Sequence, residues 1–234
     1  MKNWTQQDLE RYFKTYYAPN NCVVVISGAL KFEEVKRLAE KYMQPISAQP
    51  ALRKVHIIEP KQTGERRITV QKEVSNPYMM IAYHTPEAKN EDYYALNILS
   101  SILSNGKSSR LYASLVDNQQ LATMVFTDYG DSFDPGLFNI YAVANTNITS
   151  ELIENAIYIE IDKIKEEGIT EKELQKVKNQ KLMEFYNQIE KIDGKSNNIG
   201  TYEVFFGDYK KMFDEEPKVK ACHAGLECGI LGKH

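Results

Sequence analysis

The chain has 234 residues, of which 42% are hydrophobic and 26% are charged, and its formal net charge is -3 at pH 7. This composition is typical of a folded globular protein with a sizeable core, and it excludes a disordered chain. Charges of both signs are spread along the chain, which argues against nucleic-acid binding because that needs a concentrated basic face, and no apolar run reaches the length of a membrane span.

A helix, a strand and a second helix are predicted near the N-terminus. Thr5 and Asp8 form a helix start that leads into an apolar stripe. Residues 22–27 are a short apolar run typical of a buried strand, and Cys22 within it is expected to be a buried small side chain. Residues 32–43 are predicted to form an amphipathic helix. Because one strand cannot form a sheet alone, this part is expected to dock on another part of the protein.

A linker is predicted over residues 48–65, where two proline-containing loops flank an extended segment. The next domain begins at residue 66. Residues 66–72 alternate apolar and polar side chains, as a half-solvated strand does. Residues 77–84 are more apolar throughout, which indicates a central strand, and residues 93–103 are predicted to be helical.

The rest of this domain is predicted to contain two strands followed by three helices. The strands, over residues 124–129 and 137–143, are joined by a turn-rich loop and are expected to pair antiparallel. The first helix covers residues 150–167, the second opens with a capping box between Thr170 and Glu173, and the third covers residues 195–206. Strand pairs between groups of helices predict an α+β fold, with a mixed or antiparallel sheet and helices packed on one face.

The most informative stretch runs from Ser104 to Ala122. Asn105-Gly106 is a turn signal, because glycine accepts a positive φ at no steric cost. Ser108 or Ser109 is then placed to cap a helix by accepting a backbone N–H. A phosphate-binding loop is the alternative, but that motif needs a glycine five positions before Gly106 and a preceding strand. The sequence has Ser101 there, after a helical pattern, so helix, turn, helix is favoured.

The helix after this turn carries a family motif. Ser109-Arg110-Leu111-Tyr112-x-x-Leu115 resembles the second domain of zinc metallopeptidases related to pitrilysin, insulinase and mitochondrial processing peptidase, the inverzincins. Residues 4–21 are similar to the segment that closes the first domain of that family, and residues 200–208 resemble a late helix of the second. The resemblance covers roughly residues 4–213.

The resemblance begins part-way through the first family domain, so the chain is expected to be a piece of a longer protein. It implies a ferredoxin-like sheet decorated with helices. It divides the chain into four parts. Residues 1–47 are the end of the zinc domain, residues 48–65 are a linker, and residues 66–214 are the second domain, which lines the substrate chamber. Residues 215–234 are an atypical tail left by truncation or a shifted reading frame.

The zinc motif of the family, His-x-x-Glu-His, does not occur in this sequence. Catalytic zinc needs three protein ligands and one open position, so no catalytic or metal-binding residue and no cofactor are predicted here, and zinc is expected in the upstream domain. The second family domain usually adds an Arg and a Tyr that hold the substrate. By resemblance they fall in the helix after the motif, at Val116 and Thr123, and both departures remove the needed donors.

Other candidate sites have plainer interpretations. Arg110 and Tyr112 belong to the turn motif and are interpreted as a helix N-terminus and a packed ring. The turn-rich loop between the strands predicted over residues 124–129 and 137–143 carries spaced carboxylates at its start and within it, Asp128, Asp131 and Asp134. It lacks the glycine and the terminal glutamate of a calcium site, so a turn explains these residues better. The tail residues do not have a standard zinc spacing, so a solvated tail is favoured; they are Cys222, His223, Cys228 and His234.

These observations predict a non-catalytic domain of a zinc endopeptidase that shapes its peptide-binding chamber. The chain alone is expected to be inactive, and its partners are peptide substrate and the upstream zinc domain or a catalytic subunit. An inactive scaffold or interaction subunit of the same family is the alternative.

A hydrolase using His84 with Ser100 or Ser101 lacks a third orienting group. A tail that does not supply the last family strand leaves a sheet edge, so self-association is expected.

Overall fold

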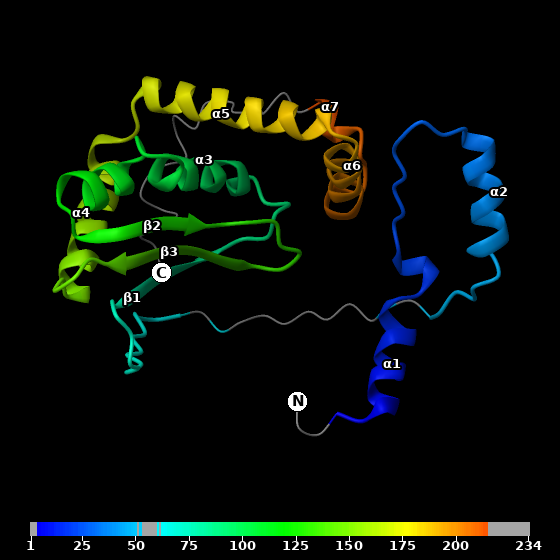
Figure 1. Ribbon diagram of the computed structural model, residues 1–234, viewed down its shortest axis with the longest axis horizontal. Helices are drawn as coiled ribbons and strands as arrows, with labels where there is room; N and C mark the ends of the chain where they lie inside the picture. Colours follow the sequence, from blue (N-terminus) through cyan, green and yellow to red (C-terminus); the bar gives the residue numbers. More distant parts are fainter. Residues whose placement is uncertain (1–3, 51, 53–59, 61, 215–234) are drawn as a thin grey trace. The chain divides into compact units, whose positions relative to one another are not determined.

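The computed structural model describes residues 4–50, 52, 60 and 62–214 (Figure 1). These residues form two compact units. Unit 1 consists of the described part of Met1–Pro60 together with Asn187–Asp214, and unit 2 consists of the described part of Lys61–Tyr186. Residues 187–214 thus group with unit 1, whereas the predicted boundaries keep them with the second domain; those boundaries stay a prediction.

Unit 1 is helical. Its elements are α1 (Gln6–Tyr16), the short 3-10 helix η1 (Pro19–Asn21), α2 (Phe32–Tyr42), α6 (Ile192–Phe206) and α7 (Lys211–Asp214). The predicted start of α1 is confirmed, because the Thr5 hydroxyl accepts the Asp8 N–H and the Asp8 carboxylate accepts the Thr5 N–H. Neither α1 nor α2 contains a buried residue. Their apolar faces are therefore uncovered among the described residues.

The strand predicted over residues 22–27 is wrong for this structure. The segment is described but pairs with no strand among the described residues, and Val25 lies beside Gly200 of α6 instead. Cys22 is exposed, not buried as expected. Both differences have one cause: a strand forms only where a neighbouring strand takes up its backbone N–H and C=O groups.

Unit 2 is built on an antiparallel sheet. Its strands are β1 (Tyr78–Thr85), β2 (Ala122–Asp128) and β3 (Gly136–Ala144), in the order β1-β3-β2. The predicted antiparallel pairing of the two later strands is confirmed, and so is the α+β class. The expectation that residues 77–84 form a central strand is wrong, because β1 lies at one edge of the described sheet and alternates between covered and exposed side chains. Residues 66–72 form no strand here.

Helices cover one face of this sheet. They are α3 (Asp92–Ser104), the π-helix η2 (Tyr112–Asn118) and α4 (Ser150–Glu167). A further helix, α5 (Glu171–Glu190), packs on α3 through Leu174 and Val177 and continues into unit 1. The core of unit 2 lies between α3, η2, α4 and the sheet, and Leu96, Phe138 and Ile157 are fully buried in it. The predicted helices are confirmed, and the predicted inward stripe of α4 is buried: Ile153, Ile157, Ile161 and Ile164.

The helix predicted after the Asn105-Gly106 turn has an unexpected form. It continues as the π-helix η2, in which the Gln119 N–H bonds the Ser114 carbonyl at 3.0 Å. Such wide turns accommodate one extra residue. Leu111 and Leu115 are both fully buried despite the wide turn.

Candidate functional site

The turn that opens the family motif is formed as predicted. Gly106 has a φ of +82°, which only glycine adopts readily. The Ser109 backbone N–H donates to the Gly106 carbonyl at 3.0 Å, and the Ser109 hydroxyl donates to the same oxygen at 2.7 Å. Ser109 is buried. It therefore closes the turn as a donor, whereas the sequence suggested a serine that accepts a helix N–H.

Arg110 joins this turn to the junction between α4 and α5. Its Nε donates to Glu173 Oε1 at 2.7 Å and its Nη2 donates to Glu173 Oε2 at 2.9 Å. Nη2 also donates to the Gly168 carbonyl, just after α4, at 3.0 Å. Two parallel bonds to one carboxylate are the strongest arrangement for an arginine. The guanidinium thus bonds groups within unit 2, which favours the structural role expected for Arg110.

Glu173 is held from two directions. The capping box predicted for α5 is confirmed: Thr170 donates its N–H at 2.9 Å and its hydroxyl at 2.8 Å to Glu173 Oε2, and Glu173 N–H donates back to Thr170 Oγ1 at 3.2 Å. The bonds from Arg110, and to a smaller extent those from Thr170, lower the pKa of Glu173 to about 2 against the opposing effect of burial. One carboxylate therefore caps a helix and anchors the motif.

This low pKa predicts a stability that depends on pH. The folded pKa of Glu173, about 2, lies below its ordinary value of 4.5. Its contribution is therefore complete above about pH 5 and is lost as the pH falls toward 2. We expect Glu173→Gln to lower the free energy of unfolding by about 1–2 kcal/mol at neutral pH, a range reduced for solvent screening. Urea denaturation of both proteins at several pH values should show the difference shrinking in acid; a constant difference would contradict the assignment.

The other motif residues are held by packing. Leu111 and Leu115 are fully buried in the core of unit 2, and the half-buried Tyr112 packs against it. From α5, the Lys176 ammonium donates to the Ser108 hydroxyl at 2.8 Å. The structure thus brings the whole predicted motif together around the turn. Glu173 was identified only as part of a capping box, because nothing in its local sequence indicates an arginine 63 positions earlier.

The two positions where the family holds substrate lie in different elements. Val116 is in η2 and packs, half-buried, against the core. Thr123 was expected in the same helix, which is wrong: η2 ends at Asn118 and Thr123 lies in β2. Its hydroxyl donates to the Val143 carbonyl at 3.3 Å. The loss of substrate-holding donors at these two positions stays a prediction.

The alternative catalytic groups are not brought together. His84 is exposed on β1, next to Tyr83, whose ring packs against the core on the other face of the sheet. Ser100, on α3, shares a 2.7 Å hydrogen bond with the Thr127 hydroxyl, and Ser101 donates to the Asn97 carbonyl at 3.1 Å. These serines therefore serve the packing of α3.

The aspartate-rich loop also has a structural use. Asp131 accepts the hydroxyl of Tyr93, and burial together with this bond raises the pKa of Tyr93. The Ser132 hydroxyl donates to the Asp134 carbonyl at 2.6 Å. These bonds agree with a turn rather than a calcium loop.

Within the described residues, no group of three or more His, Cys, Asp or Glu side chains is placed to hold a metal ion. The candidate cluster of Cys222, His223, Cys228 and His234 lies outside those residues, as does the predicted tail structure. Of the helices described, none has the length and apolar character needed to cross a membrane.

Comparisons with known proteins agree with the motif. A zinc protease of Helicobacter pylori, PqqE, is 29% identical over 221 residues, which cover 91% of this chain and 50% of the relative. A zinc protease of Bacillus subtilis, YmxG, is 24% identical over 212 residues, covering 91% of this chain and 51% of the relative. The chain thus spans about half the length of these curated relatives.

Solved structures extend the comparison to the fold. The crystal structure of a protease from Helicobacter pylori superimposes with a TM-score of 0.83 at 30% identity, covering 92% of this chain and 54% of that one. An M16 inactive domain from Pseudomonas fluorescens superimposes with a TM-score of 0.77 at 18% identity, covering 99% and 55%. The family model described as the peptidase M16 inactive domain matches residues 3–181. The chain therefore belongs to the peptidase M16 family and carries its inactive, non-catalytic domain.

Proposed function

We propose that this chain is the non-catalytic half of a zinc peptidase and forms part of the wall of its peptide chamber. The observation that carries the proposal is the set of hydrogen bonds made by the Arg110 guanidinium. It bonds Glu173 and Gly168 instead of facing a substrate. The zinc proteases that this chain resembles are about twice as long. The zinc site and the hydrolytic chemistry then belong to the other half.

The partner of this half is a zinc-bearing domain or subunit. Two features support this. First, α1 and α2 have no buried residue, although both carry amphipathic stripes that normally pack on a sheet. Second, residues 4–21 resemble the end of the family's zinc domain. We therefore propose that residues 1–47 complete the zinc domain and that residues 66–214 form the second domain.

Complementation tests this proposal. The purified chain, the other half of the Helicobacter pylori relative and an equimolar mixture are each given zinc and quenched peptides. We expect no chelator-sensitive turnover from the chain alone, because without bound metal nothing lowers the pKa of a water from 15.7 toward about 7. We expect the mixture to cleave the quenched peptides faster than the other half alone.

Two results would overturn the proposal. Chelator-sensitive turnover by the chain alone would show that it carries its own catalytic site. A stable complex that adds nothing to turnover would instead favour the alternative, a scaffold or interaction subunit. The metal content of each sample after dialysis serves as the control, because zinc should remain with the other half only.

A further inference from the structure

We propose that Asn105 is a site of spontaneous chemical modification, at which the side-chain amide is hydrolysed to a carboxylate by way of a cyclic imide. The reaction needs a following residue whose backbone nitrogen can reach the side chain, and glycine permits this best because it has no Cβ. Asn105-Gly106 is the only Asn-Gly pair in the sequence. It lies in the turn between α3 and the family motif, where Asn105 is half-buried and Gly106 is exposed.

Water is the co-reactant of this modification, and no electron is transferred. The Gly106 nitrogen forms a bond to Asn105 Cγ, the bond from Cγ to Nδ2 breaks, and the amide leaves as ammonia with the proton of the Gly106 N–H. Water then opens the imide at either carbonyl. Opening at Cγ gives an aspartate. Opening at the main-chain carbonyl gives an isoaspartate, in which the main chain runs through the side chain and is longer by one carbon.

The nucleophile of this reaction is available in the turn. Among the described residues, none accepts a hydrogen bond from the Gly106 N–H. The bonds made by Ser109 use the Gly106 carbonyl instead, which accepts both the backbone N–H and the hydroxyl of Ser109. Because Gly106 is exposed, its N–H is free to lose a proton to a base in solution, which makes the nitrogen reactive.

The folded backbone holds this nucleophile away from its target. Asn105 has a φ of −83° and a ψ of 102°. The Gly106 nitrogen lies beside the Asn105 Cβ only at a negative ψ outside the common backbone regions, so ring closure needs a different conformation of the turn. The bond from the Asn105 N–H to the Ser101 carbonyl, at 2.9 Å, and the bonds of Ser109 oppose that change. The reaction therefore proceeds through local opening of the turn, and the free energy of opening sets its rate.

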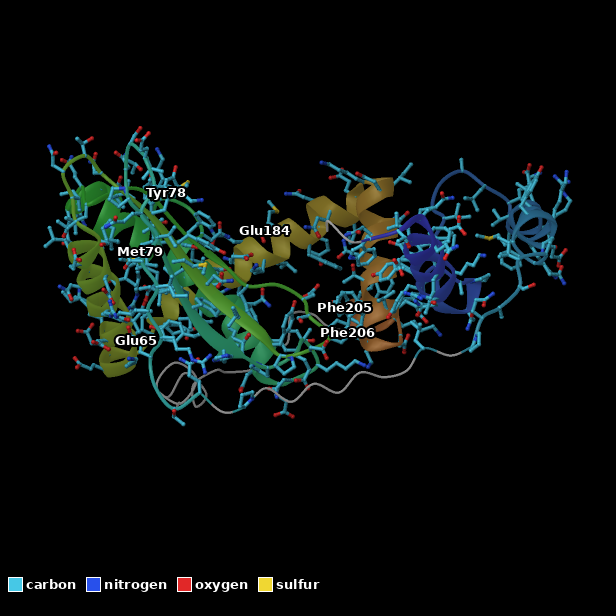
Figure 2. The ribbon with its side chains drawn as sticks, turned by 90° about the horizontal axis from the view of Figure 1, so that it is seen from below. Glu65, Tyr78, Met79, Glu184, Phe205 and Phe206 are labelled. Atoms are coloured by element: carbon cyan, nitrogen blue, oxygen red, sulfur yellow. The ribbon has the colours of Figure 1, made fainter. Side chains whose placement is uncertain are left out.

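A side-chain bond to α5 controls this opening. Asn105 Nδ2 donates to Glu184 Oε1 at 3.2 Å, across 79 residues of sequence. Glu184 projects from α5 (Figure 2), and its Oε2 lies 3.7 Å from the Nζ of Lys181. Ring closure has to break the bond to Glu184, because Nδ2 is the leaving group. The product then places a second carboxylate beside Glu184, where like charges repel. Modification thus removes a bond between the turn and α5 and replaces it with a repulsion.

Mass spectrometry of the whole chain tests the proposal. The folded chain is kept in neutral buffer, sampled over time and digested with trypsin. The tryptic peptide of residues 90–107 carries Asn90, Asn97 and Asn105, so fragmentation compares these asparagines within one peptide. A synthetic peptide of the same sequence gives the rate without a fold. We expect conversion to be confined to Asn105, to give both aspartate and isoaspartate, and to be at least about tenfold slower in the whole chain than in the synthetic peptide.

Variants test the role of Glu184. Glu184→Ala should raise the rate at Asn105 about tenfold, because a hydrogen bond to a charged group no longer opposes opening. Glu190→Ala is the matched control, since Glu190 is an exposed glutamate at the end of the same helix, and it should leave the rate unchanged. Asn105→Asp mimics the product and should lower the urea midpoint of unfolding. Adding Glu184→Gln to Asn105→Asp should restore the midpoint, because it removes the repulsion between the two carboxylates.

Several results would overturn the proposal. If Asn105 stays intact in the whole chain while the synthetic peptide is converted, it is not a site of modification. A rate that is the same in the whole chain and in the peptide, or that Glu184→Ala leaves unchanged, would mean that the fold does not control the reaction. Equal conversion of Asn97 would indicate global unfolding. Circular dichroism shows whether each variant is folded, and Glu184→Gln, which keeps the size of the side chain, replaces Glu184→Ala if that variant is not.

Discussion

Truncating Phe138 to alanine is expected to lower the free energy of unfolding by about 3–5 kcal/mol, the largest effect we anticipate from one side chain. Phe138 lies in the central strand β3, is fully buried, and its ring centroid lies 5.8 Å from that of Tyr129. Its removal loses buried apolar surface and leaves a cavity that the surrounding helices cannot fill.

Leu137→Ala is the matched control, because Leu137 is the preceding residue of β3 and points to the exposed side. Its loss should cost less than about 1 kcal/mol. Urea denaturation followed by circular dichroism measures both. Similar costs for the two variants would mean that the inner face of the sheet is not the core of unit 2.

Replacing Arg110 by alanine is expected to cost about 3 kcal/mol. The variant leaves Glu173 with an unbalanced charge and the Gly168 carbonyl without this donor, in a place where the exposed fractions of the Arg110 and Glu173 side chains are 16% and 27%. Removing one member of a sheltered ion pair costs more than the pair contributes, because the remaining charge stays partly desolvated. Arg110→Lys should recover only part of the loss, since lysine cannot make both parallel bonds.

Arg11→Ala provides the comparison, because Arg11 pairs with Asp8 on the exposed surface of α1. That pair should contribute less than about 1 kcal/mol. A double-mutant cycle with Glu173→Gln isolates the coupling between Arg110 and Glu173. If Arg110→Ala were as stable as the wild type, the hydrogen bonds of Arg110 would not stabilise the fold, and the main support for the proposed function would be lost.

Local patterns identified most elements of unit 2. The four isoleucines of α4 recur at helical spacing and are buried together, and the reciprocal bonds of Thr170 and Glu173 follow from residues three apart. Such features depend on neighbours in the sequence, so they are visible without a structure. The antiparallel pairing of β2 and β3 was likewise predictable, because a short turn-rich loop joins them.

Features that depend on distant residues were not predictable in the same way. Residues 22–27 have the composition of a strand, yet no described strand pairs with them and Cys22 is exposed. The edge position of β1 depends on which strands surround it. For the site, sequence identified the motif and predicted a structural role for Arg110 at a helix N-terminus, but it did not predict the partner Glu173, which is 63 residues away. Thr123 was misplaced because the extent of η2 has no sequence signal.

The π-helical form of η2 has a consequence for comparing family members. Leu111 and Leu115 are buried on either side of its first residues, while the wide turn accommodates one residue more than an ordinary helical turn. A relative that is one residue shorter between Ser109 and Asn118 can keep both leucines in the core by closing an α-helical turn instead. We therefore expect a single-residue gap in an alignment at this point to mark a change of helix type and not the loss of the motif.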